Sequence, residues 1–283
     1  MAVKTVVEIC NFNDTKLRDA LAGLASQTFQ PDTVLIADGG SGEGYRREIM
    51  AFIQGEPAVS KMNIIWKTLE GTQPETRQKS IPFLEGEITA FLDSDEVPSP
   101  AWLEALTAPI REGRADFTGG PMLSNPGTDY ISSYYSELER RIYGSDVEMD
   151  VTYMPLGNTA WKTEILRKLG FDPRLAQSYG QAEDYDIEMR SVDAGYRGLF
   201  VREAEVRHNQ TYPASFTGLV RKRYAYLLAA AVVMTKNRRL RKRASEKRER
   251  VKHPFAKYEA LMKPVALVHG FLRWHLVVSR RRV

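Results

Sequence analysis

The first 93 residues alternate between apolar runs and amphipathic segments, and this alternation restricts the possible fold more than any other feature of the sequence. Apolar runs typical of buried strands occupy residues 5–10, 31–38, 61–69 and 87–93, and helical periodicity occupies residues 14–27, 43–55 and 74–86. The βαβαβαβ order predicts an α/β fold with a mostly parallel central sheet, because parallel neighbours need helical crossovers. In such sheets, ligands bind beyond the carboxyl ends of the strands.

After Pro100 the alternation is less regular. The pattern predicts strands over residues 115–123 and within 197–210, and helices over 101–113, 130–144, 158–170 and 182–195, the last two ending at Gly170 and Gly195. From Ala214 onward, apolar residues recur every three to four positions, which predicts one long amphipathic helix. A length of 283 residues accommodates one sizeable α/β domain with an appendage.

Three acids are crowded at the exit of the fourth apolar run, in the stretch ITAFLDSDEVPSP. Asp93, Asp95 and Glu96 lie within four positions, where neighbouring carboxylates raise one another's pKa. Two interpretations fit: a solvated acidic turn that caps the helix starting near Ser99, or a site for a divalent cation, since carboxylate oxygens suit Mg²⁺ or Mn²⁺. Asp38 ends an earlier strand, directly before two glycines that expose backbone N–H groups.

Charge is divided unequally along the chain. Residues 213–283 contain 19 Lys or Arg and 3 Glu, whereas residues 1–212 contain 21 basic and 33 acidic residues. The basic stretch 236–252 has no interleaved aromatic residue, which argues against nucleic acid as a partner. The apolar segment 264–278 is too short and too polar to span a bilayer. We therefore expect residues 213–283 to associate with an anionic membrane surface; docking on the protein itself is the alternative.

Two features bear on cellular location. A single cysteine, Cys10, excludes an internal disulfide and is typical of a reducing compartment. The N-terminus enters a strand-like pattern at once, without the apolar region and cleavage site of a signal peptide. We expect the catalytic part in the cytoplasm, peripherally attached to the inner face of the plasma membrane.

Seven segments resemble, in their order and approximate spacing, the family 2 glycosyltransferases of the GT-A fold. They are VVEICNFND, VLIADGGSGE, TRQKS, AFLDSDEVPSPAWLEAL, GNTAWKTEILRKLGFDP, QAEDYDIEMRSVDAGYR and VRHNQTYP. The resemblance covers roughly residues 3–225 and implies a GT-A catalytic domain over residues 1–212, with a donor-binding half over about 1–100 and an acceptor half over about 101–212. The charge and the periodicity described above predict a separate helical, strongly basic region over 213–283. The resemblance also implies transfer of a sugar from a UDP- or GDP-linked donor to a lipid-linked or cell-surface glycan, usually with inversion and with Mn²⁺ or Mg²⁺.

The resemblance implies roles for residues on the donor side. Phe12 corresponds to an aromatic ring near the base, Asp38 to a carboxylate that reads the base, and Arg77 to an arginine that contacts the diphosphate or ribose. Asp93 and Asp95 correspond to the Asp-x-Asp pair, of which the first faces the ribose and the second the metal. The chain departs from the usual pattern with DGGS in place of DDGS and TRQKS in place of ARN-x-G, departures that concern base recognition rather than the fold.

On the acceptor side, Asp184 matches the family's catalytic base. Glu183 precedes it and is expected to bind acceptor or donor sugar; the alternative is that both acids only cap the helix that they begin. Gly157, Asn158 and Trp161 resemble the segment that lines the sugar pocket, where the indole would stack on a sugar face.

Further expectations concern side chains near these motifs. His208 matches a histidine that points toward the metal or diphosphate, while a structural histidine on a strand is the alternative. The basic stretch 221–224 either reaches the diphosphate or an anionic acceptor, or forms an ordinary basic helix face. Asp186 and Glu188 are expected to face solvent, and Trp102 to lie in the core.

Three functions remain open at this level. The first is an inverting, metal-dependent glycosyltransferase. The second is a sugar-phosphate nucleotidyltransferase, although the sequence CNFNDTK after the first strand lacks the glycine-rich loop that such enzymes usually carry. The third is a non-catalytic protein that binds nucleotide sugars, for which the presence of both Asp95 and Asp184 would be coincidental.

Overall fold

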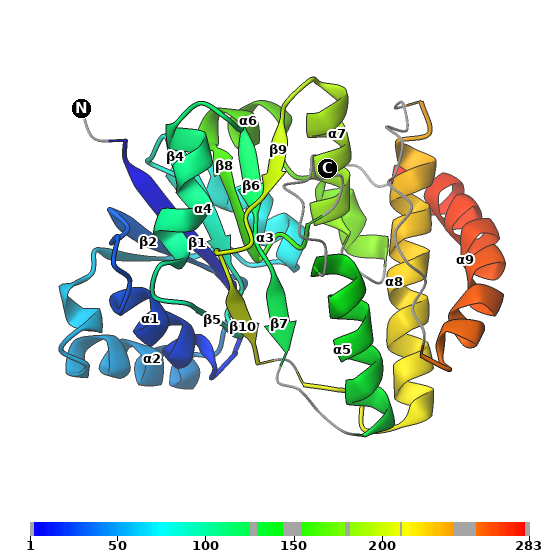
Figure 1. Ribbon diagram of the computed structural model, residues 1–283, viewed down its shortest axis with the longest axis horizontal. Helices are drawn as coiled ribbons and strands as arrows, with labels where there is room; N and C mark the ends of the chain where they lie inside the picture. The colour runs from blue at the N-terminus through cyan, green and yellow to red at the C-terminus, as the bar shows by residue number, and fades with distance from the viewer. Residues whose placement is uncertain are drawn as a thin grey trace.

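A computed structural model describes residues 3–124, 129–143, 154–178, 182–209, 211–239 and 253–280. Its centre is a seven-stranded sheet with the order β3-β2-β1-β4-β8-β6-β9 (Figure 1). The strands are β1 (Thr5–Asn11), β2 (Thr33–Asp38), β3 (Ile64–Thr68), β4 (Ile88–Leu92), β6 (Phe117–Gly119), β8 (Asn158–Lys162) and β9 (Gly198–Phe200). Of these strands, β8 alone runs antiparallel to its neighbours, so the predicted mostly parallel sheet is confirmed.

Helices cover both faces of this sheet. In Figure 1, α4 lies in front of the strands and α3 behind them. The helices associated with the large sheet are α1 (Leu17–Ala25), α2 (Glu43–Gly55), α3 (Gln73–Ser80), α4 (Trp102–Arg111), α6 (Thr163–Leu169) and α7 (Glu183–Asp193). Short 3₁₀ helices span Val59–Lys61, Ile81–Phe83, Pro173–Ser178 and Val278–Arg280. The helices that connect the first four strands confirm the alternation expected from the sequence.

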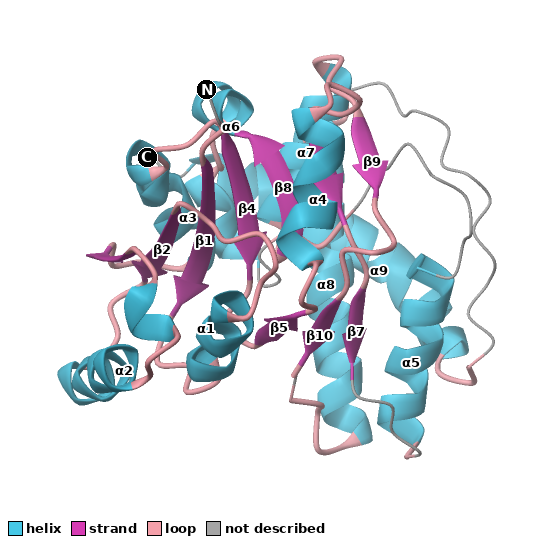
Figure 2. Ribbon diagram, turned by 60° about the vertical axis from the view of Figure 1, so that its left-hand side comes forward, coloured by secondary structure: helices cyan, strands magenta, loops and turns pink. Residues whose placement is uncertain are grey.

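A second sheet of three strands lies beyond the ends of the main strands (Figure 2). Its strands are β5 (Glu96–Pro98), β7 (Met122–Ser124) and β10 (Val206–His208), in the order β5-β10-β7. The prediction of a single strand over 115–123 is therefore wrong, because this segment contributes β6 to the large sheet and β7 to the small one. Gly120 permits this break: a Cβ atom there would lie 1.9 Å from the carbonyl oxygen of Ala204, an approach that only glycine allows.

The helix expected over 158–170 is wrong in its first half. Residues Asn158–Lys162 form β8, which pairs with β4 on one side and with β6 on the other. The helix α6 begins only at Thr163, and it ends at Gly170, whose φ of 61° confirms the expected terminator. The two neighbouring strands provide hydrogen-bond partners for the backbone N–H and C=O groups of β8 on both sides. These partners are distant in the sequence, so the local periodicity of residues 158–162 does not reveal them.

Three further helices lie together on the side of the molecule away from α2 (Figure 1). They are α5 (Tyr130–Tyr143), α8 (Phe216–Lys236) and α9 (Ala256–Leu276). The helix α8 confirms the long helix expected after Ala214, and its N-cap Ser215 accepts a hydrogen bond from the N–H of Gly218. The helix α9 packs along α8, where a Cβ atom on Gly270 would lie only 2.5 Å from that of Ala231.

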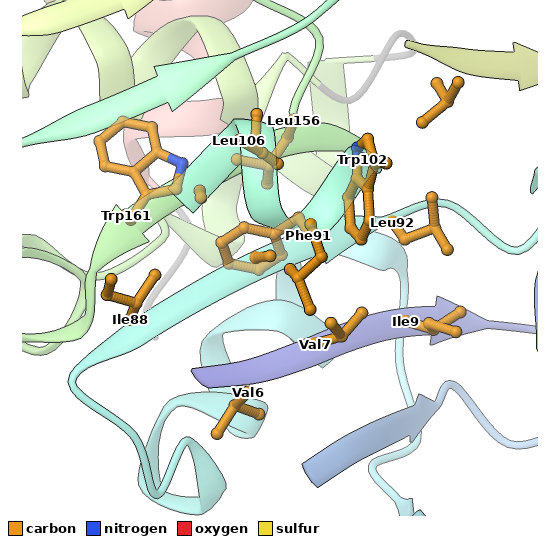
Figure 3. Close-up of a cluster of buried hydrophobic side chains, with 14 of the residues drawn as sticks. Val6, Val7, Ile9, Ile88, Phe91, Leu92, Trp102, Leu106, Leu156 and Trp161 are labelled. Atoms are coloured by element: carbon orange, nitrogen blue, oxygen red, sulfur yellow. The ribbon is translucent and has the colours of Figure 1, made fainter. Parts of the chain in front are cut away.

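The core fills the space around β1 and β4 (Figure 3). Val7 and Phe91 come from these strands, and Trp102 and Leu106 reach them from α4. All four side chains are fully buried, which confirms the expectation for Trp102. Since each buried large side chain contributes about 1.5–3 kcal/mol, this cluster gives the main sheet a rigid centre from which the strand ends project.

Candidate active site

Two adjoining cavities open where the carboxyl ends of β1, β2 and β4 meet the amino end of β8. The first, of about 790 Å³, is lined by residues that follow β1 and β2, by the start of α3, and by Asp93–Asp95. The second, of about 800 Å³, is lined by residues of α5, α7 and α8 together with His208. Gln73 and Asp93 line both cavities. The predicted binding edge of the sheet is thus hollowed at the expected place.

A tight turn after β4 sets the direction of the acidic pair. The N–H of Glu96 donates to the carbonyl of Asp93 at 3.1 Å, and the N–H of Asp93 donates to the Glu96 carboxylate at 3.2 Å. The backbone of Gly157 closes over this turn, because a Cβ atom there would lie 2.6 Å from the Asp93 carboxyl carbon. Gly157 also lines the second cavity, next to the acidic pair.

Arg77 joins this turn to the beginning of α7. One guanidinium nitrogen donates to Asp93 at 2.7 Å, and another donates to Glu183 at 2.5 Å. Thr72 and Glu75 form a capping box that fixes the start of α3, and Arg77 is 2% exposed. Charge-assisted bonds of this kind are strong and directional, so Arg77 holds the Asp-x-Asp turn and the acids of α7 at a fixed separation.

The two acids at the start of α7 differ in their surroundings. Glu183 is buried, and its pKa is raised by burial, with the Arg77 guanidinium opposing this shift. Asp184 is half-buried in the wall of the second cavity, and burial raises its pKa to about 6, while a hydrogen bond from the N–H of Tyr185 at 2.6 Å lowers it. A cavity carboxylate with this pKa is ionised at neutral pH and can accept a proton.

Asp95 and His208 meet on the other side of the turn. The imidazole Nε2 lies 3.3 Å from a carboxylate oxygen of Asp95, and the Lys16 ammonium lies 3.9 Å from the same oxygen. Burial raises the pKa of Asp95, but the hydrogen bond from His208 and the positive charges of His208 and Lys16 together outweigh burial, so the pKa is lowered overall. Burial lowers the pKa of His208, but Asp95 and the nearby Glu96 raise it overall.

These two side chains fit a divalent cation only in part. In the described residues, no group of three His, Cys, Asp or Glu could hold a metal ion. Asp95 and His208 provide an oxygen and a nitrogen ligand at one point, and their side chains are 24% and 22% exposed. Mg²⁺ is usually held by one or two carboxylates together with substrate phosphates, so a pair of protein ligands suits an ion that binds with its nucleotide.

On the donor side, Phe12 lines the first cavity and is 63% exposed, so its ring is accessible for stacking on a planar group such as a nucleobase. Asp38 is fully buried and holds the turn after β2, where its carboxylate accepts from the hydroxyl of Ser41 at 2.5 Å and from the amide of Asn11 at 3.3 Å. Gly39, rather than Asp38, lines the cavity.

Two residues expected in the sugar pocket lie elsewhere. Trp161 is fully buried and stacks on Phe117 with 4.3 Å between ring centroids, so its indole is part of the core. The Asn158 amide donates to the carbonyls of Pro121 and Ala204 at 3.0 and 2.8 Å. Both expectations are corrected for the same reason: β8 is a central strand, and its side chains fill the layers above and below the sheet.

The expectation that Asp186 and Glu188 face solvent is also wrong, since both are buried. Asp186 accepts from Lys236 at 2.5 Å, which ties α7 to the end of α8, and Glu188 accepts from the N–H of Met154 at 2.9 Å. The role of α5 and α8 as cavity walls could not be predicted from the sequence. The sequence indicates this role only through the basic stretch 221–224, of which Lys222 and Arg223 line the second cavity.

One buried acid lies beneath the site. Glu8 is fully buried in the middle of β1, and burial raises its pKa to about 7, with Arg77 opposing this shift and Asp93 adding to it. The folded protein therefore holds an extra proton between about pH 4.5 and 7, so Glu8 makes stability fall as pH rises through this range.

We expect Glu8→Gln to remove this loss and to raise the free energy of unfolding at pH 8 by up to about 3 kcal/mol, with little change at pH 4.5. Urea denaturation at the two pH values measures the difference. Glu56→Gln, an exposed change of the same chemistry, serves as the control. If the Glu8→Gln variant is no more stable than wild type at pH 8, ionisation of the buried Glu8 carboxyl does not destabilise the folded protein.

Comparison with known proteins identifies the family. The family model described as "Glycosyl transferase family 2" matches residues 6–170, more than half of the chain. The chain belongs to glycosyl transferase family 2. This confirms the resemblance of the motifs, and the protein is a glycosyltransferase. No curated protein matches it in sequence.

Solved structures share the fold of this glycosyltransferase at low identity. Mannosyltransferase PcManGT from Pyrobaculum calidifontis, in complex with GDP-Man and Mn²⁺, is 16% identical with a TM-score of 0.63, over 100% of this chain and 77% of that one. S. aureus TarS 1–349 in complex with UDP-GlcNAc is 16% identical with a TM-score of 0.57, over 96% and 91%. GalNAc-T7 with UDP, GalNAc and Mn²⁺ is 14% identical with a TM-score of 0.59, over 98% of this chain but 56% of GalNAc-T7. The GT-A fold is thereby confirmed.

Proposed function

We propose that this glycosyltransferase moves a sugar from a UDP- or GDP-linked donor to a hydroxyl of a lipid-linked or cell-surface glycan, with inversion at the anomeric carbon and with Mn²⁺ or Mg²⁺. The proposal rests mainly on the second cavity, which the Asp-x-Asp side and the acids of α7 line together. Its wall includes Asp93 and His208 from the Asp-x-Asp side and Glu183 and Asp184 from α7, and Arg77 bonds directly to both sides. The structural neighbours that bind GDP-Man, UDP or UDP-GlcNAc support a nucleotide-sugar donor.

The two cavities suit the two halves of a donor. The exposed ring of Phe12 and the backbone around Gly39 would hold the nucleoside in the first cavity. The diphosphate would then extend past Asp93 toward Asp95 and His208, which would hold the metal. A bound divalent ion would neutralise the charge that gathers on the diphosphate as the glycosidic bond breaks.

Asp184 supplies the base on the acceptor side. The carboxylate would take the proton from the acceptor hydroxyl while the hydroxyl oxygen bonds to the anomeric carbon and the diphosphate departs with the electrons of the broken C–O bond. Attack from the side opposite the leaving group inverts the anomeric carbon. Glu183 is held by Arg77 and cannot take this role without breaking a buried ion pair.

A donor panel tests this function. We expect UDP- or GDP-linked sugars to be hydrolysed slowly, releasing nucleoside diphosphate, only when Mn²⁺ or Mg²⁺ is present and not in EDTA. Release of pyrophosphate from nucleoside triphosphate and sugar phosphate would instead identify a nucleotidyltransferase. Binding of nucleotide sugars without turnover in any acceptor extract would identify a binding protein.

The outer face of α9 supports attachment to a membrane surface. Leu261, Val265, Val268 and Leu272 lie along one side of the helix and are 49–72% exposed, while the opposite side packs on α8. No described helix is long and apolar enough to cross a bilayer. The helix α9 thus docks on the protein and also presents an apolar face, and in the sequence it follows the strongly basic stretch 236–252. We propose that this surface binds the cytoplasmic face of an anionic membrane.

We expect the double variant Val265→Glu, Val268→Glu to bind phosphatidylglycerol vesicles at least about tenfold more weakly than wild type, because two apolar side chains no longer enter the interface. Sedimentation with vesicles measures this. Arg47→Glu on α2 changes the net charge by the same amount at an exposed position far along the chain and serves as the control. Equal loss in both variants would mean that net charge, and not the α9 face, governs binding.

A further inference from the structure

The wall of the second cavity that α5 and α8 build carries a cation without a carboxylate partner. Lys222, on α8, is half-buried in this wall. Within the described residues, its ammonium makes no ion pair and no hydrogen bond. Its neighbour in sequence, Arg223, is bonded to Glu259 at 2.7 Å, and Lys236 at the end of the same helix lies 3.0 Å from Asp172. Because an unpaired charge that is partly buried is costly, Lys222 differs from Arg223 and Lys236 in a way that calls for an anion.

A second polar group in the same wall also lacks a partner. Tyr135, on α5, is 5% exposed, and its hydroxyl has no hydrogen-bond partner among the described residues. The Lys222 ammonium lies 5.4 Å from the centre of the Tyr135 ring, so the ring holds the cation in place. An ammonium and a phenolic O–H are both donors, and both side chains line the second cavity, where a bound anion would offer acceptors to both.

The location of these donors points to a phosphate. Lys222 lines the same cavity as His208 and Asp93, the two residues that the diphosphate would pass as it leaves. Burial lowers the pKa of Lys222, and the carboxylate of Asp95 opposes this shift, so the ammonium lies within electrostatic reach of the proposed metal ligand. A neutral sugar alone would leave the charge of Lys222 uncompensated.

We propose that Lys222 and Tyr135 form an anion site that binds a phosphate group of the substrate within the second cavity. This inference rests on the proposed function, because the phosphate belongs either to the departing nucleoside diphosphate or to a phosphorylated lipid acceptor. In both cases α8, which lies outside the residues matched by the family model, takes part with α5 in binding the reacting groups.

The test uses the full chain with three variants: Lys222→Met, Lys222→Arg and Tyr135→Phe. Arg221→Met, an exposed change one residue away, is the control. Calorimetric titration with UDP and with GDP in the presence of Mn²⁺ gives the first readout. We expect Lys222→Met to weaken nucleoside diphosphate binding at least tenfold, Tyr135→Phe to weaken it severalfold, and Lys222→Arg and the control to stay within about threefold of wild type.

A second readout separates the two sources of phosphate. If nucleoside diphosphate affinity is unchanged while the KM for a polyprenyl-phosphate acceptor rises at least tenfold in Lys222→Met, the site serves the acceptor. If neither value changes in Lys222→Met or Tyr135→Phe, the anion site does not exist. Failure of wild type to bind any nucleotide would instead overturn the proposed function. Removal of an unpaired cation should not lower the Tm, and Tyr135→Phe keeps the test independent of any folding defect at Lys222.

Discussion

Replacing Asp184 with Asn is expected to reduce sugar transfer by about 10²–10⁴-fold while leaving donor affinity within about twofold of wild type. The amide has nearly the same shape as the carboxylate but cannot take the proton of the acceptor hydroxyl. Asp184 lines the cavity and is half-buried, while Glu183 beside it is bound to Arg77 and cannot substitute. Initial rates with saturating acceptor give the loss in kcat, and calorimetry with the nucleoside diphosphate gives donor affinity.

The pH profile gives an independent check on Asp184. Its pKa is raised to about 6, so the base is protonated below that pH, and kcat/KM of the wild type should fall as pH decreases through about 6. The Asp184→Asn variant should lose this acid limb. Asp193→Asn, at the other end of α7, is the matched control and should keep both the rate and the limb. If the Asp184→Asn variant has the kcat of wild type, another group deprotonates the acceptor hydroxyl.

The second large effect is expected at Asp95. Asp95→Asn should remove most of the gain in nucleoside diphosphate affinity that Mn²⁺ provides and should reduce turnover at least about a hundredfold, because a neutral amide is a weaker ligand for a hard cation. In the structure, two side chains approach the same carboxylate oxygen of Asp95, the His208 imidazole at 3.3 Å and the Lys16 ammonium at 3.9 Å. Titration of nucleotide with Mn²⁺ and with EDTA measures the metal-dependent part of the binding energy.

Asp19→Asn controls for the loss of one negative charge, since Asp19 is exposed on α1. Its metal-dependent affinity should equal that of wild type. If Asp95→Asn retains the full effect of Mn²⁺, the ion is held by other residues, and the acidic turn has the structural role that the sequence also allowed.

The fold of the first half could be predicted from the sequence because its signals are local. Helical segments connect the apolar runs of β1 to β4, and the parallel direction of these strands follows from such crossovers. The acidic pair and Asp38 end β-strands on the same edge, so their nearness to the binding edge also followed. The pattern could not show that the buried Asp38 carboxylate accepts a hydrogen bond from Ser41 and so stabilises the turn that follows β2.

The errors arise where long-range contacts decide the structure. Asn158–Lys162 has a pattern compatible with a helix, yet it becomes a strand because β4 and β6 offer hydrogen bonds on both sides. Trp161 follows this change into the core. Asp186 is buried because Lys236, fifty residues later, neutralises it, and only the packing of α8 brings the two together. Lys222 and Tyr135 meet for the same reason, from helices far apart in the sequence.

The most direct test of the central claim is the position of Mn²⁺ in crystals grown with the ion and a nucleoside diphosphate, located by anomalous scattering. We predict one ion bound by Asp95 and His208 at about 2–2.3 Å, bridging to the diphosphate, with Asp184 facing the same cavity. An ion bound to the nucleotide but out of reach of both Asp95 and His208 would contradict the account.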